Sequence, residues 1–212
     1  KRFTIFFDQY LFIAITLLSV MGLFFLYSAS QGNINVVMKQ SIFVGFGIFL
    51  MFILSQPDPD IYKILSRVFL ITSLILVLIT ILVAKEINGA KRWLDLGVFT
   101  LQPSELVKIA LPIYLAAYLF EKPIPIDLKN TFKSLLIIAV CFLLIARQPD
   151  LGTSLVVSMA GVYILFFAGL SWKFIGSSII VFLISLPFLW NNFLQPFQQQ
   201  RILTSLDPSA DP

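Results

Sequence analysis

The sequence contains no histidine and only one cysteine among its 212 residues. Without histidine, the chain cannot build a histidine-based metal site or a Ser-His-Asp triad from its own residues. The single thiol, Cys141, has no intrachain disulfide partner, and its place inside an apolar run predicts that it packs as a small hydrophobic side chain. These absences exclude several common kinds of catalytic and metal site.

Charge is also scarce, because 12% of the residues are charged while 58% are hydrophobic. A soluble domain is roughly a quarter charged, so this chain cannot cover its apolar surface with polar groups in water. It requires an apolar solvent, and the composition therefore predicts a membrane protein. Basic residues are not interleaved with the 22 phenylalanines, which argues against a nucleic-acid-binding surface.

Apolar runs long enough for transmembrane helices recur along the chain. A bilayer core needs about 20 apolar helical residues. The sequence predicts an all-α, polytopic membrane fold with seven such runs, at 10–29, 36–55, 68–84, 103–120, 134–146, 153–170 and 173–190. Pro149 and Gly152 make a continuous helix through the fifth and sixth runs unfavourable. The first run is too long for the apolar region of a cleavable signal peptide, so we expect it to be retained.

The basic residues give the predicted orientation. If the N-terminus is cytoplasmic, the basic residues on the cytoplasmic side are Lys1, Arg2, Lys63, Arg67, Lys122, Lys129, Lys133 and Lys173. The other side then holds Lys39, Lys85, Lys91, Arg92, Lys108, Arg147 and Arg201. Since Lys39, Lys108 and Arg147 lie at or within span ends, the loops favour a cytoplasmic N-terminus.

Five charged residues fall at membrane depth, all toward the predicted extracytoplasmic side: Lys39, Glu105, Lys108, Arg147 and Asp150. Charges inside a bilayer are costly, so each is a candidate functional residue, although long side chains can also reach the interface. Glu105 and Lys108 are three apart on one helix face, where an ion pair is the structural alternative.

Except for Lys39, these charges lie in two segments, 88–108 and 147–154. In the first, Lys91 and Arg92 can attract a phosphate, and Pro103 suits the first turn of a helix. Glu105 lies in that turn, where its negative charge can stabilise the helix by interacting with the helix dipole. In the second, Asp150 is placed to cap the sixth helix, whose N-terminus is also an anion-binding position.

Several motifs, in the same order and spacing, resemble the SEDS family (shape, elongation, division and sporulation). They are Gly89-Ala90-Lys91-Arg92-Trp93, Gln102-Pro103-Ser104-Glu105, Gln148-Pro149-Asp150-Leu151-Gly152-Thr153, and Arg201 through Asp207-Pro208. The segments at 92–97 and 148–153 are more similar to the elongation protein RodA than to the division protein FtsW, which remains the alternative branch.

The resemblance implies a peptidoglycan glycosyltransferase of the bacterial inner membrane with ten transmembrane helices. Such a protein polymerises lipid II, an undecaprenyl-pyrophosphate-linked disaccharide peptide, beside a class B penicillin-binding protein. We expect a single membrane domain at 1–212, an extracytoplasmic loop at 85–104, and the start of a large extracytoplasmic loop at 191–212. The family's essential aspartate is expected beyond Pro212. Asp207 and Asp211 are not that residue, so this chain alone is expected to be inactive.

The resemblance also assigns roles. It implies that Glu105 and Lys108 support catalysis, with Lys108 as a pyrophosphate or cavity contact. Glu105 either orients Lys108 or assists with the acceptor or a metal. Lys91, Arg92 and Arg201 are expected to contact pyrophosphate or line the cavity, while Asp150 shapes it. The cofactor is left open: a divalent cation such as Mg²⁺ is compatible with these residues. Gln199 stands where many relatives have a second arginine, so the number of cationic contacts is open.

Two other functions remain compatible with the residues. Charges around an outward-facing cavity also suit a flippase that translocates lipid II. The fragment can also be an inert scaffold that binds a partner. Labelled lipid II distinguishes the enzyme from the flippase, because only the enzyme forms glycan polymer.

Overall fold

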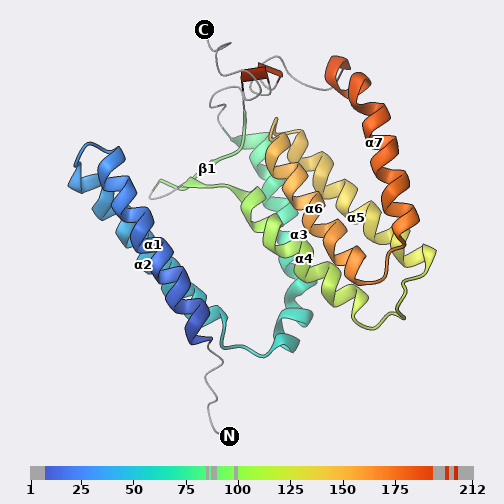
Figure 1. The fold of residues 1–212 in the computed structure, drawn as a ribbon, viewed down its shortest axis with the longest axis horizontal. Coiled ribbons are helices and arrows are strands. Elements are labelled where there is room, and N and C mark those ends of the chain that lie inside the picture. Colours follow the sequence, from blue (N-terminus) through green and yellow to red (C-terminus); the bar gives the residue numbers. More distant parts are fainter. Residues whose placement is uncertain are drawn as a thin grey trace, which may run out of the picture. The chain divides into compact units, whose positions relative to one another are not determined.

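A computed structural model describes residues 8–84, 86, 90–97, 100–192, 199–200 and 203–204. Within this part of the chain it has seven helices and two short strands (Figure 1). They are α1 (Gln9–Ala29), α2 (Ile34–Leu54), α3 (Pro59–Val83), β1 (Leu94–Asp95), β2 (Thr100–Leu101), α4 (Pro103–Leu119), α5 (Leu128–Ala146), α6 (Leu151–Phe167) and α7 (Trp172–Asn192). The chain divides between Tyr62 and Lys63 into two compact units.

The first unit is a helical hairpin of α1 and α2. Asp8 caps α1, because its Oδ1 accepts hydrogen bonds from the backbone N–H groups of Tyr10 and Leu11 at 3.0 and 3.1 Å. Asn33 caps α2 in the same way, accepting from the N–H of Asn35 at 3.1 Å. Neither helix has a buried residue, so their apolar side chains are left for lipid or for other protein surfaces.

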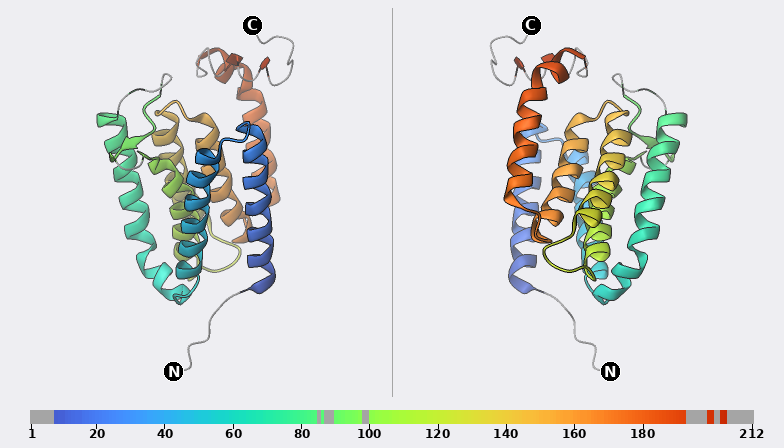
Figure 2. Two further views of the ribbon diagram at one scale, coloured as in Figure 1. Left: turned by 90° about the vertical axis from the view of Figure 1, so that its left-hand side faces the viewer. Right: turned by 90° about the vertical axis from the view of Figure 1, so that its right-hand side faces the viewer.

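The core of the second unit lies among α3, α4, α5 and α6, which run roughly parallel or antiparallel to one another (Figures 1 and 2). Val107, Leu111, Ile145, Val157 and Leu165 are fully buried there. The helices approach closely at Gly161 of α6, where a Cβ atom would lie 2.7 Å from Cγ1 of Ile138. Small residues allow such close helix contacts in membranes, where packing rather than water exclusion drives association.

The segment between α3 and α4 contains a β-hairpin. β1 and β2 pair antiparallel, with Leu94 opposite Leu101 and Asp95 opposite Thr100. At the turn, Oδ1 of Asp95 accepts a hydrogen bond from the N–H of Gly97 at 2.9 Å, and Gly97 adopts a φ of 81°. The hairpin lies at the same end of the unit as the α5–α6 turn (Figure 1). We call this the motif end.

The predicted fold class is confirmed, and a helix lies at each of the seven predicted runs. By length and composition, α1, α2, α3 and α5 are suited to cross a membrane. The boundaries of two runs were wrong: α3 begins at Pro59 rather than 68, and α5 begins at Leu128 rather than 134. Polar first turns caused both errors, since Asp60 and Lys129 belong to helices that hydropathy alone begins later.

Candidate active site

The motif that begins at Gln102 and the motif that contains Asp150 are in contact at the motif end. Nε2 of Gln102, the residue before α4, donates hydrogen bonds to Oδ2 of Asp150 at 3.2 Å and to Oγ of Ser104 at 3.1 Å. Asp150 in turn caps α6, because its Oδ1 accepts from the N–H of Thr153 at 3.2 Å. Asp150 is 8% exposed, so this link joins the starts of α4 and α6 in a largely buried setting.

Arg92 ties the hairpin segment to the same turn. Its Nε donates to the carbonyl oxygen of Gln148 at 3.3 Å, and its Nη2 donates to the carbonyl oxygen of Pro149. Carbonyls just after a helix end have no intrahelical partner, and the several N–H groups of a guanidinium suit them. The side chain that the sequence suggested as a phosphate contact therefore holds the α5–α6 turn in this structure.

Glu105 and Lys108 form an ion pair on the first turns of α4, with 2.7 Å between Oε2 and Nζ. The side chains remain 51% and 32% exposed, respectively, so the pair is open to a ligand. The N-cap residue Gln102 makes no side-chain capping bond, and Pro103 opens the helix. Pro112 follows one turn after Lys108 and lacks the N–H that would normally bond the Lys108 carbonyl, which leaves another acceptor in this region.

Gln148 is a residue that the sequence interpretation did not assign to the site. Its side chain is 1% exposed, and neither Nε2 nor Oε1 has a hydrogen-bond partner in the described part of the chain. Burying an amide without hydrogen-bond partners costs free energy. The Gln148 amide is therefore a donor and acceptor that a ligand could satisfy, two residues from Asp150. One sequence signal was available: Gln102 and Gln148 both precede a proline at a helix boundary.

The structure does not draw every predicted residue into this cluster. Lys91 is exposed and forms no ion pair or hydrogen bond with the described residues. Arg201, Asp207 and Asp211 lie outside the described residues. No group of three or more Asp, Glu, Cys or His side chains is arranged for a metal ion in the described ranges.

Comparison with known proteins places the chain in a family. The model of the family described as cell cycle protein, which covers FtsW, RodA and SpoVE, matches residues 8–212. The chain belongs to this family. FtsW/RodA/SpoVE membership confirms the resemblance that the sequence motifs carried.

Two curated relatives of the family show the extent of the likeness. The chain is 34% identical over 205 residues to the peptidoglycan glycosyltransferase MrdB of Escherichia coli strain K12, which covers 97% of this chain and 55% of MrdB. It is 31% identical over 184 residues to the probable peptidoglycan glycosyltransferase FtsW of Aliivibrio salmonicida, covering 83% of this chain and 44% of that protein. The chain thus spans about half the length of these relatives.

Two solved structures share the fold of this chain. The chain matches a structure described as a peptidoglycan synthase complex that coordinates polymerization and crosslinking, with a TM-score of 0.84 and 31% identity. That match covers 98% of this chain and 61% of the other. The rod shape determining protein RodA of Thermus thermophilus gives a TM-score of 0.76 and 30% identity, covering 88% of this chain and 60% of RodA.

Proposed function

We propose that the full-length protein is a peptidoglycan glycosyltransferase that polymerises lipid II in cell elongation. One observation carries the proposal: MrdB, named for this activity, is 34% identical over 97% of the chain. The partly exposed Glu105–Lys108 ion pair supports it, because charges within a membrane helix are costly and are therefore candidate functional residues.

The residues suit separate roles in glycosyl transfer. This reaction needs a base that takes the proton of the acceptor hydroxyl and cations that stabilise the departing pyrophosphate. Lys108 is the proposed pyrophosphate contact, held in orientation by Glu105 at 2.7 Å. Exposed Lys91 is a second cation available to the same group. The base is proposed to lie in the part of the full-length protein beyond Pro212.

Arg92 and Asp150 are proposed as positioning residues. Arg92 holds the α5–α6 turn through backbone carbonyls, and Asp150 joins Gln102 to the start of α6. Both are therefore proposed to act on the shape of the motif end rather than on the reacting atoms. Arg201 remains a proposed substrate contact in the segment outside the described residues.

The proposed setting follows from the family. The protein is proposed to lie in the bacterial inner membrane with a cytoplasmic N-terminus, and the motif end to face the extracytoplasmic side. A class B penicillin-binding protein is the proposed partner, supported by the likeness to a structure of a peptidoglycan synthase complex. The elongation branch is favoured over the division branch by the MrdB match.

Purified full-length protein with fluorescently labelled lipid II tests the proposal, with a glycan-ladder gel and a vesicle translocation assay run together. The proposal expects glycan polymer in the absence of any other polymerase. Lipid II movement between leaflets without polymer would instead identify a flippase. Neither polymer nor movement, from protein that is folded and binds its partner, would favour a scaffold.

A further inference from the structure

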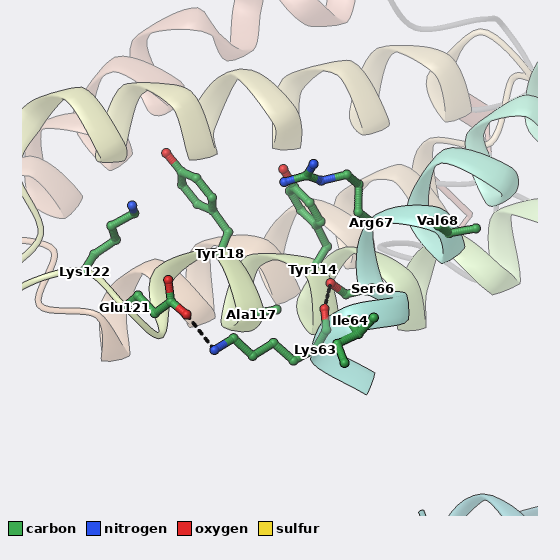
Figure 3. A pocket seen from close by; sticks show the side chains of 10 residues that line it. All are labelled: Lys63, Ile64, Ser66, Arg67, Val68, Tyr114, Ala117, Tyr118, Glu121 and Lys122. Atoms are coloured by element: carbon green, nitrogen blue, oxygen red, sulfur yellow. Dashed lines mark hydrogen bonds and ion pairs between the residues drawn. The ribbon is translucent and has the colours of Figure 1, made fainter. Parts of the chain in front are cut away.

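Two cavities adjoin at the end of the second unit opposite the motif end. The first, of about 430 Å³, lies between the start of α3 and the end of α4 (Figure 3). Its polar lining residues include Lys63, Arg67, Tyr114, Tyr118, Glu121 and Lys122. The second, of about 330 Å³, has an apolar lining that includes Leu70, Ile71, Leu74, Leu136, Ile137 and Val140. Arg67 and Tyr114 line both, so the cavities are adjacent.

The polar cavity carries uncompensated positive charge. Nζ of Lys63 bonds Oε1 of Glu121 at 2.8 Å, and this hydrogen bond and charge lower the pKa of the Glu121 carboxyl. Glu121 is therefore ionised at neutral pH and neutralises Lys63. Arg67 and Lys122 form no ion pair with the described residues, although the charge of Lys122 also helps to lower the pKa of Glu121. Three cations and one carboxylate therefore line the cavity, which leaves a net positive charge.

Neutral groups beside these cations add hydrogen-bonding capacity. Tyr114 and Tyr118 stack with their ring centroids 6.2 Å apart, and Nζ of Lys122 lies 5.6 Å from the Tyr118 ring centroid. The Tyr118 hydroxyl donates to Oδ1 of Asn130 at 2.6 Å, whereas the Tyr114 hydroxyl has no partner in the described part of the chain. Figure 3 shows the Arg67 guanidinium beside the Tyr114 ring. A guanidinium fork next to a free hydroxyl matches the oxygens of a phosphate.

The apolar cavity has the chemistry of a hydrocarbon chain site. Leu136 and Val140 of α5 are 55% and 42% exposed along its edge, so it opens to the surface that lipid covers. Arg67 stands where the polar and apolar parts join. A ligand that fills both parts combines an anionic head with a hydrocarbon tail.

We propose that these cavities form a binding site for an anionic membrane phospholipid. Arg67, Lys122 and the Tyr114 hydroxyl hold its phosphate, while an acyl chain lies along Leu70, Leu74 and Ile137. Snorkelling lysines would give only diffuse attraction to the membrane surface. In the proposed site, by contrast, Arg67 and Lys122 line a cavity. Lys129 and Lys133, on the first turns of α5, line neither cavity and serve as the comparison.

Native mass spectrometry of the full-length protein, titrated with phosphatidylglycerol or phosphatidylcholine, tests the charge requirement. The variant Arg67→Ala/Lys122→Ala is compared with Lys129→Ala/Lys133→Ala, which removes the same charge outside the cavities. The cavity variant should bind phosphatidylglycerol about tenfold more weakly, because charge-assisted hydrogen bonds are lost. The control should match the wild type, which should prefer phosphatidylglycerol to phosphatidylcholine. Equal losses in both variants would overturn the proposal.

Filling the apolar cavity tests the tail. Ile137→Trp places bulk in the cavity, whereas Leu143→Trp places it at a 57% exposed position of the same helix that lines neither cavity. Only Ile137→Trp should weaken phosphatidylglycerol binding. Millimolar inorganic phosphate should not displace the lipid, and displacement would assign the site to free phosphate instead. If the wild-type protein binds no phospholipid here, another part of the protein or a partner occupies the groove and the proposal fails.

Discussion

Asp150 has two structural tasks at the start of α6. One oxygen caps the helix through the N–H of Thr153, and the other accepts from Gln102 across the unit. An amide can perform both tasks, because asparagine is also a strong N-cap residue and the Gln102 amide can turn its oxygen toward the new donor. Neutral and truncating substitutions therefore separate structure from charge.

Asp150→Ala should lower the free energy of unfolding by about 1–2 kcal/mol, the usual loss for a cap removed from a helix. Asp150→Asn should keep most of that stability. Thermal unfolding of the full-length protein in detergent measures both. A folded Asn variant without activity would show that the charge matters, whereas equal destabilisation by Asn and Ala would contradict the cap assignment.

The candidate site was only partly predictable from sequence. An ion pair was the structural alternative for Glu105 and Lys108, three apart on a helix, and the two side chains do pair at 2.7 Å. The cap at Asp150 was likewise predicted from local spacing and is confirmed. The neighbouring Lys91 and Arg92 could not be told apart, because the contact of Arg92 with the α5–α6 turn joins segments 56 residues apart and leaves no local pattern.

At the scale of elements, the α4–α5 and α6–α7 connections contact each other at the end opposite the motif end. The N–H of Ile126, before α5, donates to the carbonyl oxygen of Ala168 at the end of α6, at 3.1 Å. Gly169 has a φ of 91°, and a Cβ there would lie 2.8 Å from Cα of Pro125. Glycine is required for both reasons: the left-handed conformation disfavours a side chain, and the backbone of the neighbouring turn leaves no room.

Gly169→Ala should destabilise the protein by about 2 kcal/mol or more, combining left-handed strain with overpacking against a backbone. Gly176→Ala is the matched control, because a Cβ at this position of α7 meets nothing within 4 Å. That variant should be neutral or slightly stabilising, since alanine favours helix over glycine. Thermal denaturation of both variants checks this, and equal melting temperatures would disprove the close contact.

Helix existence was predictable because apolar runs near bilayer length have few alternatives. The hairpin β1–β2 was not, since four paired residues in a segment rich in turn residues carry too little alternation to predict strands. The start of α5 was also missed, because Lys129 and Lys133 interrupt the apolar pattern while Asp127 caps the helix earlier. Element ends thus depend on caps more than on hydropathy.

At the scale of the whole molecule, the second unit has chemically different ends. The motif end gathers Arg92, Asp150 and the Glu105–Lys108 pair, whereas the opposite end carries the cavity with Arg67 and Lys122. From the positive-inside rule we propose that the latter end is cytoplasmic. The motif end would then face the side on which peptidoglycan is assembled.

Cysteine labelling with a membrane-impermeant maleimide tests this orientation. The native Cys141 is fully buried and should stay unlabelled. Asp95→Cys, at the exposed hairpin, should react in intact spheroplasts, and Lys129→Cys should react only after permeabilisation. The reverse pattern would invert the predicted topology.

The initial rate of lipid II polymerisation by purified full-length variants tests the central claim most directly. Lys108→Ala should lose at least about 100-fold, as expected when a group that stabilises developing charge is removed. Lys129→Ala, which removes a cation from the opposite end, should retain the wild-type rate. The exchange Glu105→Lys/Lys108→Glu would restore a purely structural ion pair, but it should remain inactive if Lys108 contacts pyrophosphate. Wild-type polymerisation by Lys108→Ala would contradict the account.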